Sequence, residues 1–247
     1  MQFHSIIYPK LSSTNEILLE KRHDADFHGK VICALEQSAG RGRRGRNWTS
    51  AKGNLAFSLG FRCFAEEVKI YTWLPFFVGI VLHEVLARYL TAEAVEFLSL
   101  KWPNDILWKE KKLCGVLTQV KQEKDECYFV VGVGLNLKSA PLEFPAIAFS
   151  DLPLQKALPS IESFLQEILT EMEKQFPNID QPSLLKKAWE RRAKFFGKEI
   201  RYGNFEEAGA MEEGIALSLS EAGGLLVKNK KTGKILSLIS DDISIRY

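Results

Sequence analysis

Hydrophobic residues recur with helical spacing in three segments of the chain. The apolar positions of residues 71–90 predict a long core helix. Those of residues 161–176 lie on one helical face, which predicts an amphipathic helix packed against a core. A further helix is expected to begin at Pro182. The proline-rich stretch 137–159 between these helices is expected to be irregular.

Shorter runs of β-branched and apolar residues predict strands. Residues 31–35 (VICAL) indicate a buried strand, and residues 55–61 alternate large with small side chains, as a strand does. A short strand is expected at 97–100, and a hairpin at 113–121 and 127–131. The small residues of the 55–61 strand would leave room for a ligand against the sheet, although small residues in strands more commonly accommodate packing.

Beyond Gly197 the pattern changes to short strands separated by glycine turns. These strands are expected at about residues 199–202, 214–219, 225–228, 235–238 and 243–246. They predict a small SH3-like β-barrel over residues 197–247, beside a main domain over residues 1–196. The expected fold class is α+β, in which a mixed β-sheet flanked by helices forms the main domain.

The composition sets limits on function. The 247 residues carry a net charge of +2, so any anion binding has to come from local clusters and not from an overall basic field. No charged and then apolar stretch opens the chain, so no targeting leader is expected, and no apolar run approaches the ~20 residues of a membrane span. The four cysteines and four histidines show no metal-ligand spacing. We therefore expect reduced thiols, no zinc site and a cytoplasmic location.

The densest local charge cluster lies in EQSAGRGRRGRNW, residues 36–48. Its central positions 40–46 hold four arginines, three glycines and no acid. Like charges this close repel one another until an anion lies among them, and glycine leaves the backbone free. We therefore expect a mobile loop that closes around phosphate or carboxylate. A solvated basic loop and an arginine–glycine arm for RNA are the alternatives.

Three further stretches carry polar residues typical of ligand sites. Ser13 and Glu16 fit a capping box, so SSTN would begin a helix whose free amides either bind a polar ligand or are merely capped. KWPNDIL, residues 101–107, brings a lysine, an indole, an amide and a carboxylate to a strand end. The alternative there is a surface turn with a weak Lys101–Asp105 ion pair. The glycines of KLCG and GVGLN lie within strand-like sequence, where glycine often marks a close approach.

Together these motifs resemble the catalytic core of the biotin–protein ligases. STN, EQSAGRGRRGRNW, KWPND, KLCG and GVGLN occur in that family's order and at about its spacing, and the resemblance extends from about Ser12 to Tyr247. It implies a core like that of class II aminoacyl-tRNA synthetases and a two-step reaction. ATP would activate biotin as biotinyl-5′-AMP, and an acceptor lysine would then take the biotinyl group. With about a dozen residues before STN, we expect the form that lacks an N-terminal DNA-binding domain.

The resemblance also implies a role for each matched residue. It assigns catalysis to Arg43, Lys101, Asp105 and Lys112. It assigns biotin binding to Ser13, Thr14, Asn15, Gln37, Arg41, Gly42, Arg43, Lys112 and Gly115. It assigns ATP or adenylate binding to Arg41, Arg43, Arg44, Arg46, Trp48, Lys101, Asn104 and Asn136. In this scheme Gly115 leaves space beside the thioether ring of biotin, and Trp48 covers adenine. Asp105 either acts electrostatically in the transfer step or holds Lys101 and magnesium.

The same resemblance implies ATP with Mg²⁺, biotin as substrate, and the biotin carboxyl carrier domain of acetyl-CoA carboxylase or a related carboxylase as partner. Neither nucleic acid nor a membrane is expected as a partner, and a homodimer through sheet edges stays open. Gln119 stands where many members have glutamate, which leaves the metal ligands unknown. The alternative functions are a lipoate–protein ligase of the same superfamily, a nucleic-acid-binding module that uses the arginine loop, and a scaffold without activity.

Overall fold

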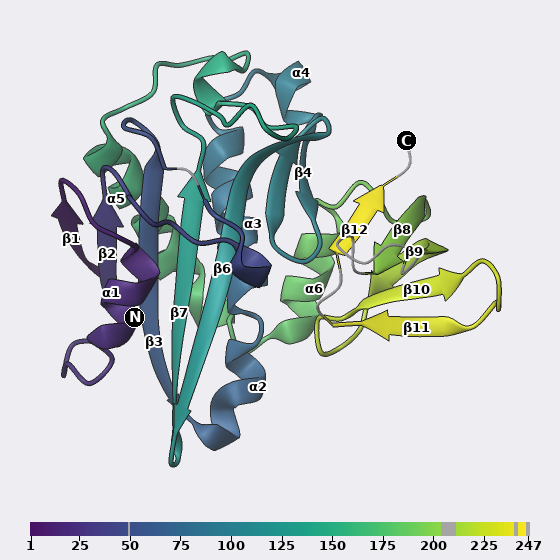
Figure 1. Cartoon of the computed structure of the whole chain (residues 1–247), viewed down its shortest axis with the longest axis horizontal. Coiled ribbons are helices and arrows are strands. Elements are labelled where there is room, and N and C mark those ends of the chain that lie inside the picture. The colour runs from purple at the N-terminus through teal and green to yellow at the C-terminus, as the bar shows by residue number, and fades with distance from the viewer. Residues whose placement is uncertain (49, 204–210, 240–241, 246–247) are drawn as a thin grey trace.

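A seven-stranded mixed sheet forms the centre of the main domain (Figure 1). The computed structural model of the chain describes residues 1–48, 50–203, 211–239 and 242–245. In sheet order the strands are β1 (His4–Tyr8), β2 (Lys30–Ala34), β3 (Leu55–Phe64), β7 (Glu126–Leu135), β6 (Lys111–Glu123), β5 (Asp105–Trp108) and β4 (Leu98–Lys101). β1 runs parallel to β2 and the other neighbours are antiparallel, so the predicted mixed sheet is confirmed.

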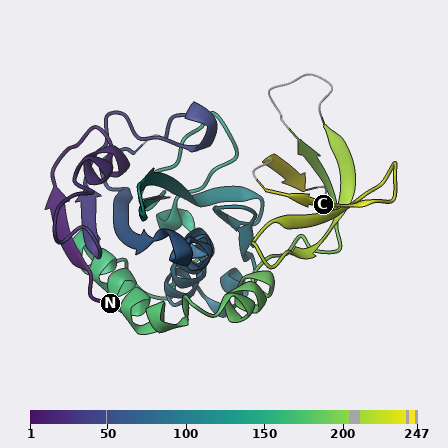
Figure 2. The same ribbon diagram turned by 90° about the horizontal axis from the view of Figure 1, so that it is seen from below.

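Helices cover both faces of this sheet. α1 packs on β3 and β7 on one face, whereas α3 packs on the opposite face with α5 and α6 outside it (Figures 1 and 2). The helices are α1 (Thr14–Glu20), α2 (Val68–Tyr71), α3 (Leu74–Ala87), α4 (Ala92–Val95), α5 (Ile161–Gln175) and α6 (Pro182–Glu190). The four predicted helices are confirmed: the one expected to begin at SSTN is α1, and the one expected at residues 71–90 corresponds to α2 and α3.

The α3 helix is apolar around its circumference because the sheet and two helices enclose it. The segment Ala65–Ala87 that contains it is long and apolar enough to cross a membrane by length and composition, which corrects the expectation that no segment reaches that limit. In the structure 61% of its most apolar window is buried inside the protein. A core helix passes the same test, so its length is weak evidence for a membrane span.

Five strands form a second, antiparallel sheet at the C-terminal end. They are β8 (Glu199–Gly203), β9 (Glu212–Leu219), β10 (Leu225–Asn229), β11 (Ile235–Leu238) and β12 (Asp242–Ile245), in the order β11-β10-β9-β8-β12. The strands predicted beyond Gly197 are confirmed, although Arg246 lies outside the described residues. The sequence patterns missed β1, whose first three residues are exposed, and β5, which begins within KWPNDIL.

The KWPND turn connects the two sheets. The Trp102 side chain is buried, and its indole Nε1 donates a hydrogen bond of 3.0 Å to the carbonyl oxygen of Gly223 in the second sheet. The ring of Phe76, on α3, packs against the same glycine, where an added Cβ would lie 2.9 Å from the ring. Ile243 of β12 reaches the cavity described below. The second sheet therefore contacts the turn between β4 and β5, and it also contacts α6, where the Leu219 N–H donates to Glu190 Oε1 at 2.8 Å.

Trp102→Phe should lower the free energy of unfolding by about 1–3 kcal/mol, because it removes this hydrogen bond and leaves the Gly223 carbonyl without its partner. Urea unfolding measures the loss. Trp108→Phe is the matched control, since its Nε1 donates at 3.0 Å to Ala94 within the main domain. Amide hydrogen exchange in the turn between β9 and β10 should speed up in Trp102→Phe alone. Equal exchange in the two variants would contradict the proposed link between the domains.

Candidate active site

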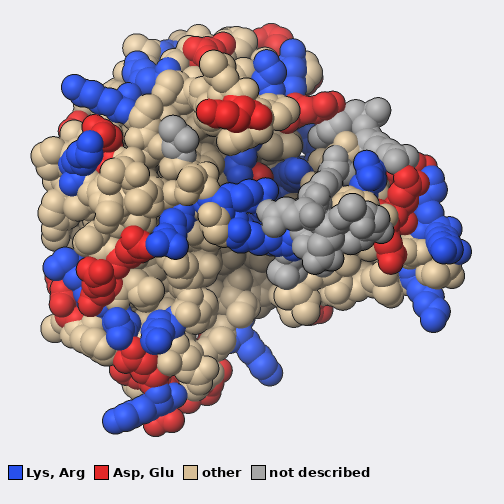
Figure 3. All heavy atoms as spheres, in the orientation of Figure 1, with Lys and Arg blue, Asp and Glu red and all other residues tan. Residues whose placement is uncertain are grey.

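A cavity of about 560 Å³ opens between the β6–β7 part of the sheet, the start of α1 and the arginine loop. Its volume is that of a typical small-molecule site. All the site residues predicted from the sequence line this cavity except Arg44 and Asn136. Figure 3 shows Lys and Arg side chains gathered around the hollow. The cations that line it are Arg41, Arg43, Arg46, Lys101 and Lys112.

The arginine loop is folded by hydrogen bonds within itself. The Gly42 N–H donates to the Arg46 carbonyl at 2.7 Å, and the Trp48 N–H donates to the Gly40 carbonyl at 2.9 Å. At the tip, Arg44 and Gly45 have φ angles of 55° and 74°. This left-handed turn leaves the Arg44 side chain exposed and outside the cavity lining. The structure gives the loop a defined course, and its mobility stays a prediction.

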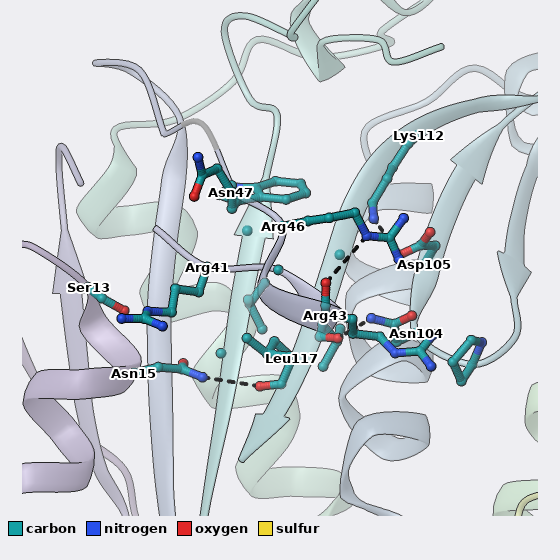
Figure 4. A pocket seen from close by; sticks show the side chains of 18 of the residues that line it. Ser13, Asn15, Arg41, Arg43, Arg46, Asn47, Asn104, Asp105, Lys112 and Leu117 are labelled. Atoms are coloured by element: carbon teal, nitrogen blue, oxygen red, sulfur yellow. Dashed lines mark hydrogen bonds and ion pairs between the residues drawn. The ribbon is translucent and has the colours of Figure 1, made fainter. Parts of the chain in front are cut away.

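The corner at the start of α1 departs from the predicted capping box. Ser13 is the N-cap residue, but its side chain makes no capping hydrogen bond. Glu16 instead forms an ion pair of 2.7 Å with Arg41 of the arginine loop. The capping-box prediction is therefore wrong, because a cation from a distant segment competes for the carboxylate. The buried Ser13 side chain lies at the wall of the cavity (Figure 4).

A chain of hydrogen bonds joins the polar residues at this corner. The N–H and the hydroxyl of Thr14 both donate to Gln37 Oε1, at 2.8 and 3.1 Å. The buried hydroxyl of Ser58 lies 2.7 Å from Thr14 Oγ1 and 2.6 Å from Asn15 Oδ1. Sequence reasoning missed Ser58, although it belongs to the small residues of the 55–61 strand. Phe27 fills the space over Gly60, and α1 packs on the same strand, as the packing alternative expects.

The opposite side of the cavity contains an ion pair between neighbouring strands. Lys112 Nζ lies 2.7 Å from Asp105 Oδ1, and both side chains are mostly buried (26% and 20% exposed) (Figure 4). The sequence patterns did not anticipate this pair, since it depends on the register of β5 and β6. Burial raises the pKa of the neighbouring Cys114 thiol, which therefore stays neutral and is no nucleophile here.

The cavity thus joins a neutral hydrogen-bonding corner to a cationic one, and comparison with known proteins agrees with that arrangement. Residues 8–136 match the model of the biotin/lipoate A/B protein ligase family. The chain belongs to this family. It is 35% identical to a biotin–[acetyl-CoA-carboxylase] ligase from Mycobacterium tuberculosis over 68% of this chain and 62% of that protein, so it spans less than two thirds of that relative.

Longer matches exist within the same family. The chain is 29% identical to the bifunctional ligase/repressor BirA of Escherichia coli over 97% of this chain and 73% of that protein. Its structure superposes on a biotin protein ligase from Aquifex aeolicus, determined in complex with biotin and ATP, with a TM-score of 0.75 and 27% identity over 98% of both chains. The two-sheet fold is therefore the fold of biotin ligases.

Two asparagines predicted to bind nucleotide have structural partners in this member of the family. Asn136 is fully buried outside the cavity lining, and its Nδ2 donates to the Lys112 carbonyl at 3.2 Å. It therefore supports the backbone of a cavity residue. Asn104 lines the cavity but donates its Nδ2 to the Val116 carbonyl. Direct contact of either residue with nucleotide stays a prediction.

Gln119, the departure from the ligase pattern, lies beside the neutral corner. Its Oε1 accepts a hydrogen bond of 2.9 Å from Asn15 Nδ2. It is seven residues from Lys112 on β6, which is roughly 23 Å of extended strand. Gln119 therefore holds Asn15 and lies far from the cationic corner.

The described residues provide no metal cage. They contain no group of three or more His, Cys, Asp or Glu side chains arranged to hold a metal ion. Asp105 is the one carboxylate among the described residues that line the cavity, and it is paired with Lys112. Mg²⁺ is commonly held by one or two carboxylates together with substrate phosphates. The donor set here fits a magnesium ion carried by nucleotide phosphates and does not fit a resident ion.

The side chains of Trp48 and Lys112 lie close to Gly115. A Cβ added to Gly115 would lie 3.2 Å from both Trp48 Cζ3 and Lys112 Cε. Gly134, which pairs with Gly115 across the strands, lies under the same indole. Lys112 Nζ is 5.4 Å from the centre of that ring. Gly115 lines the cavity, and its role beside the thioether ring of biotin stays a prediction.

Ser58→Ala should lower the free energy of unfolding by about 1–3 kcal/mol, because Thr14 Oγ1 and Asn15 Oδ1 both lose the buried hydroxyl beside them. It should also weaken the binding of biotin, the ligand that the sequence resemblance implies, since both side chains lose an anchor. Urea unfolding and isothermal titration calorimetry measure the two effects. Ser99→Ala, at a buried serine of β4 outside the cavity lining, should leave biotin affinity unchanged. Equal biotin affinity in all three proteins would contradict the role of the network.

Proposed function

We propose that this protein is an ATP-dependent biotin–protein ligase. It activates biotin as biotinyl-5′-AMP and transfers the biotinyl group to a lysine of a biotin carboxyl carrier domain. The observation that carries the proposal is that a neutral hydrogen-bonding corner and a cluster of cations line the same cavity. Relatives named biotin–[acetyl-CoA-carboxylase] ligases, and the similar ligase structure that holds biotin and ATP, support it.

In the first step a carboxylate oxygen of biotin attacks the α-phosphorus of ATP. A carboxyl–phosphate bond forms, the bond to the β-phosphate breaks, and pyrophosphate leaves. The two reactants are anions, so positive charge must lie between them. A unit charge at ~4 Å contributes about 4 kcal/mol at an effective dielectric constant near 20. In the proposal Arg43, Lys101 and Lys112 supply that charge and stabilise the developing pyrophosphate.

The neutral corner fits the ureido ring of biotin, which has one acceptor oxygen and two N–H donors. Gln37 Oε1 accepts both Thr14 hydrogen bonds, so this network assigns the Gln37 Nε2 as a donor. The Ser13 hydroxyl, free of any capping bond, can donate or accept. These two groups face the cavity, while Thr14 and Asn15 are held by Ser58 and Gln119. The proposal therefore gives direct contact to the first pair and orientation to the second.

In the second step the neutral amine of the acceptor lysine attacks the biotinyl carbonyl. An amide bond forms, the carboxyl–phosphate bond breaks and AMP leaves, while the amine loses its proton. A lysine side chain of pKa ~10.4 is almost fully protonated near neutral pH, so its ammonium group has to lose a first proton before this attack, and the nitrogen loses a second one as the amide forms. Asp105 is the carboxylate available in the described lining. We assign it an electrostatic role in this step, with Lys112 held at 2.7 Å as its counter-ion.

The defining test is pyrophosphate release with ATP, magnesium and either biotin or lipoate. Of the two acids, only biotin should support release, because a flexible lipoyl chain makes no use of the polar corner. Lipoate-dependent release would instead identify the lipoate ligase of the same family. If neither acid supports release while RNA binds with an affinity that falls steeply with salt, the nucleic-acid-binding function is the correct one.

Asp105→Asn should slow single-turnover transfer from pre-formed biotinyl-AMP to a carrier domain by about 10–100-fold. The amide keeps the shape of the carboxylate and removes its charge. Rapid-quench measurement of carrier biotinylation gives the rate. Asp151→Asn, in the short helix Phe149–Asp151 outside the cavity lining, is the control and should transfer at the original rate. An unchanged transfer rate in Asp105→Asn rules out its role in the second step.

The partner and setting form part of the same proposal. The acceptor is a carboxylase carrier domain, nucleic acid and membranes are not partners, and the location is the cytoplasm. The four cysteines are free and buried, in keeping with a reducing compartment. A homodimer could pair through β1, an edge strand of the sheet. Sedimentation with and without biotin and ATP measures whether it forms.

A further inference from the structure

The two glycines of the GVGLN motif face the cavity and take no part in the chemistry above. Gly132 and Gly134 are two residues apart on β7 and therefore lie on one face of the sheet, about 7 Å from each other. Val133 between them points to the opposite face and packs in the main core. The face with the glycines is the one that carries α1 and the arginine loop.

Gly132 belongs to a row of residues that holds Asn15. The strand register places it between Ser58 of β3 and Leu117 of β6. Asn15 Oδ1 lies 2.6 Å from the Ser58 hydroxyl, and Asn15 Nδ2 lies 3.4 Å from the Leu117 carbonyl oxygen. A Cβ added to Gly132 would overlap the Asn15 amide, at 2.8 Å from its Cγ. The row therefore anchors the amide from both sides and leaves a gap beneath it.

Gly134 belongs to a second row, which holds Trp48. Its neighbours across the strands are Ala56 of β3 and Gly115 of β6, so three small residues form a flat floor. The indole of Trp48 rests on this floor. A Cβ added to Gly134 would overlap the ring, at 2.7 Å from Cζ2. The row of Gly132 lies two residues away along β7, so the two rows are separate.

We infer that Gly132 and Gly134 are positioning residues that act on different substrates, Gly132 through Asn15 on biotin and Gly134 through Trp48 on ATP. β7 pairs with β3 on one side and β6 on the other, so its backbone cannot retreat from an added methyl group. The displaced group is then the side chain above it. A misplacement of ~1 Å in a substrate-orienting group can cost a hundredfold in rate. The identity of the two substrates rests on the proposed function, whereas the two rows do not.

Gly134→Ala should raise the KM for ATP about tenfold and change the KM for biotin less than about twofold. Gly132→Ala should do the reverse. Pyrophosphate release measured on the full chain, with each substrate varied in turn, gives both constants. Equal effects of either variant on the two KM values would overturn the inference.

Double variants test whether each glycine acts through the side chain above it. In a Trp48→Leu background, Gly134→Ala should cause less than about a twofold further change in KM for ATP, because no indole remains to be displaced. Gly132→Ala should likewise lose its effect in an Asn15→Ala background. The crossed pairs, Gly134→Ala with Asn15→Ala and Gly132→Ala with Trp48→Leu, should show multiplicative effects. Strong coupling in the crossed pairs, or none in the matched pairs, contradicts separate positions for the two side chains.

Gly60→Ala is the matched control for strain in the sheet. Gly60 lies on β3 and outside the cavity lining, and a Cβ added to it would lie 2.6 Å from the Phe27 carbonyl oxygen. It should lower the melting temperature without a selective change in either KM, and a selective change would contradict the inference. If either single glycine variant fails to fold, the matched double variant should fold again, because it lacks the obstructing side chain; a matched double that also fails to fold overturns the inference.

The same coupling can be read without substrate. Melting temperatures of the single and matched double variants should show that loss of Trp48 or Asn15 removes most of the destabilisation caused by the corresponding glycine substitution. If the melting-temperature changes of the single variants simply add in the matched double variants, the inferred contacts Gly132–Asn15 and Gly134–Trp48 are wrong. Failure of the proposed function is a separate result, namely a folded wild-type protein that releases no pyrophosphate with biotin.

Discussion

The cavity lies over a patch of the central sheet where glycines at positions 115, 132 and 134 stand in place of larger side chains. Successive residues of a strand point to opposite faces, so glycine at every second position clears one face and leaves the other intact. On β7 this spacing lets Val131 and Val133 fill the core below, while an amide and an indole approach the backbone above. Both α1 and the arginine loop are positioned by that clearance. Any larger residue at Gly132 or Gly134 would displace the side chain above it, Asn15 or Trp48, which forms part of the cavity wall.

The two ion pairs at the ends of the site differ in their exposure to water. The Glu16–Arg41 pair lies near the surface, with 58% of the arginine side chain exposed, and pairs of that kind contribute about 0–1 kcal/mol. The Asp105–Lys112 pair is mostly buried, where the same geometry is less screened by water. Arg41 can therefore exchange its carboxylate partner for a ligand at little cost. Lys112 gains more from its acid and keeps a fixed position beside the cavity.

The sequence predicted the site better than it predicted how the site is held. The arginine loop, SSTN, KWPND and KLCG are short segments whose chemistry is local, and the structure brings all of them to one cavity. Ser58 and Gln119 reach Asn15 only through pairing of strands far apart in the chain, which no local pattern specifies. The capping box failed for the same reason, since Arg41 reaches Glu16 from a distant loop. Strand and helix positions were predictable because hydrophobic period is a local property.

The KWPND turn explains why a second domain stands next to this cavity. Lys101 ends β4 and Asp105 begins β5, and both line the cavity. Trp102 is buried between them in the chain, and its indole donates a hydrogen bond to the Gly223 carbonyl in the second sheet. A movement of the C-terminal domain must therefore either break that hydrogen bond or carry the turn with it. Because Lys101 and Asp105 are the residues displaced in the second case, the docking of the small domain also fixes the spacing of the charges that face the cavity.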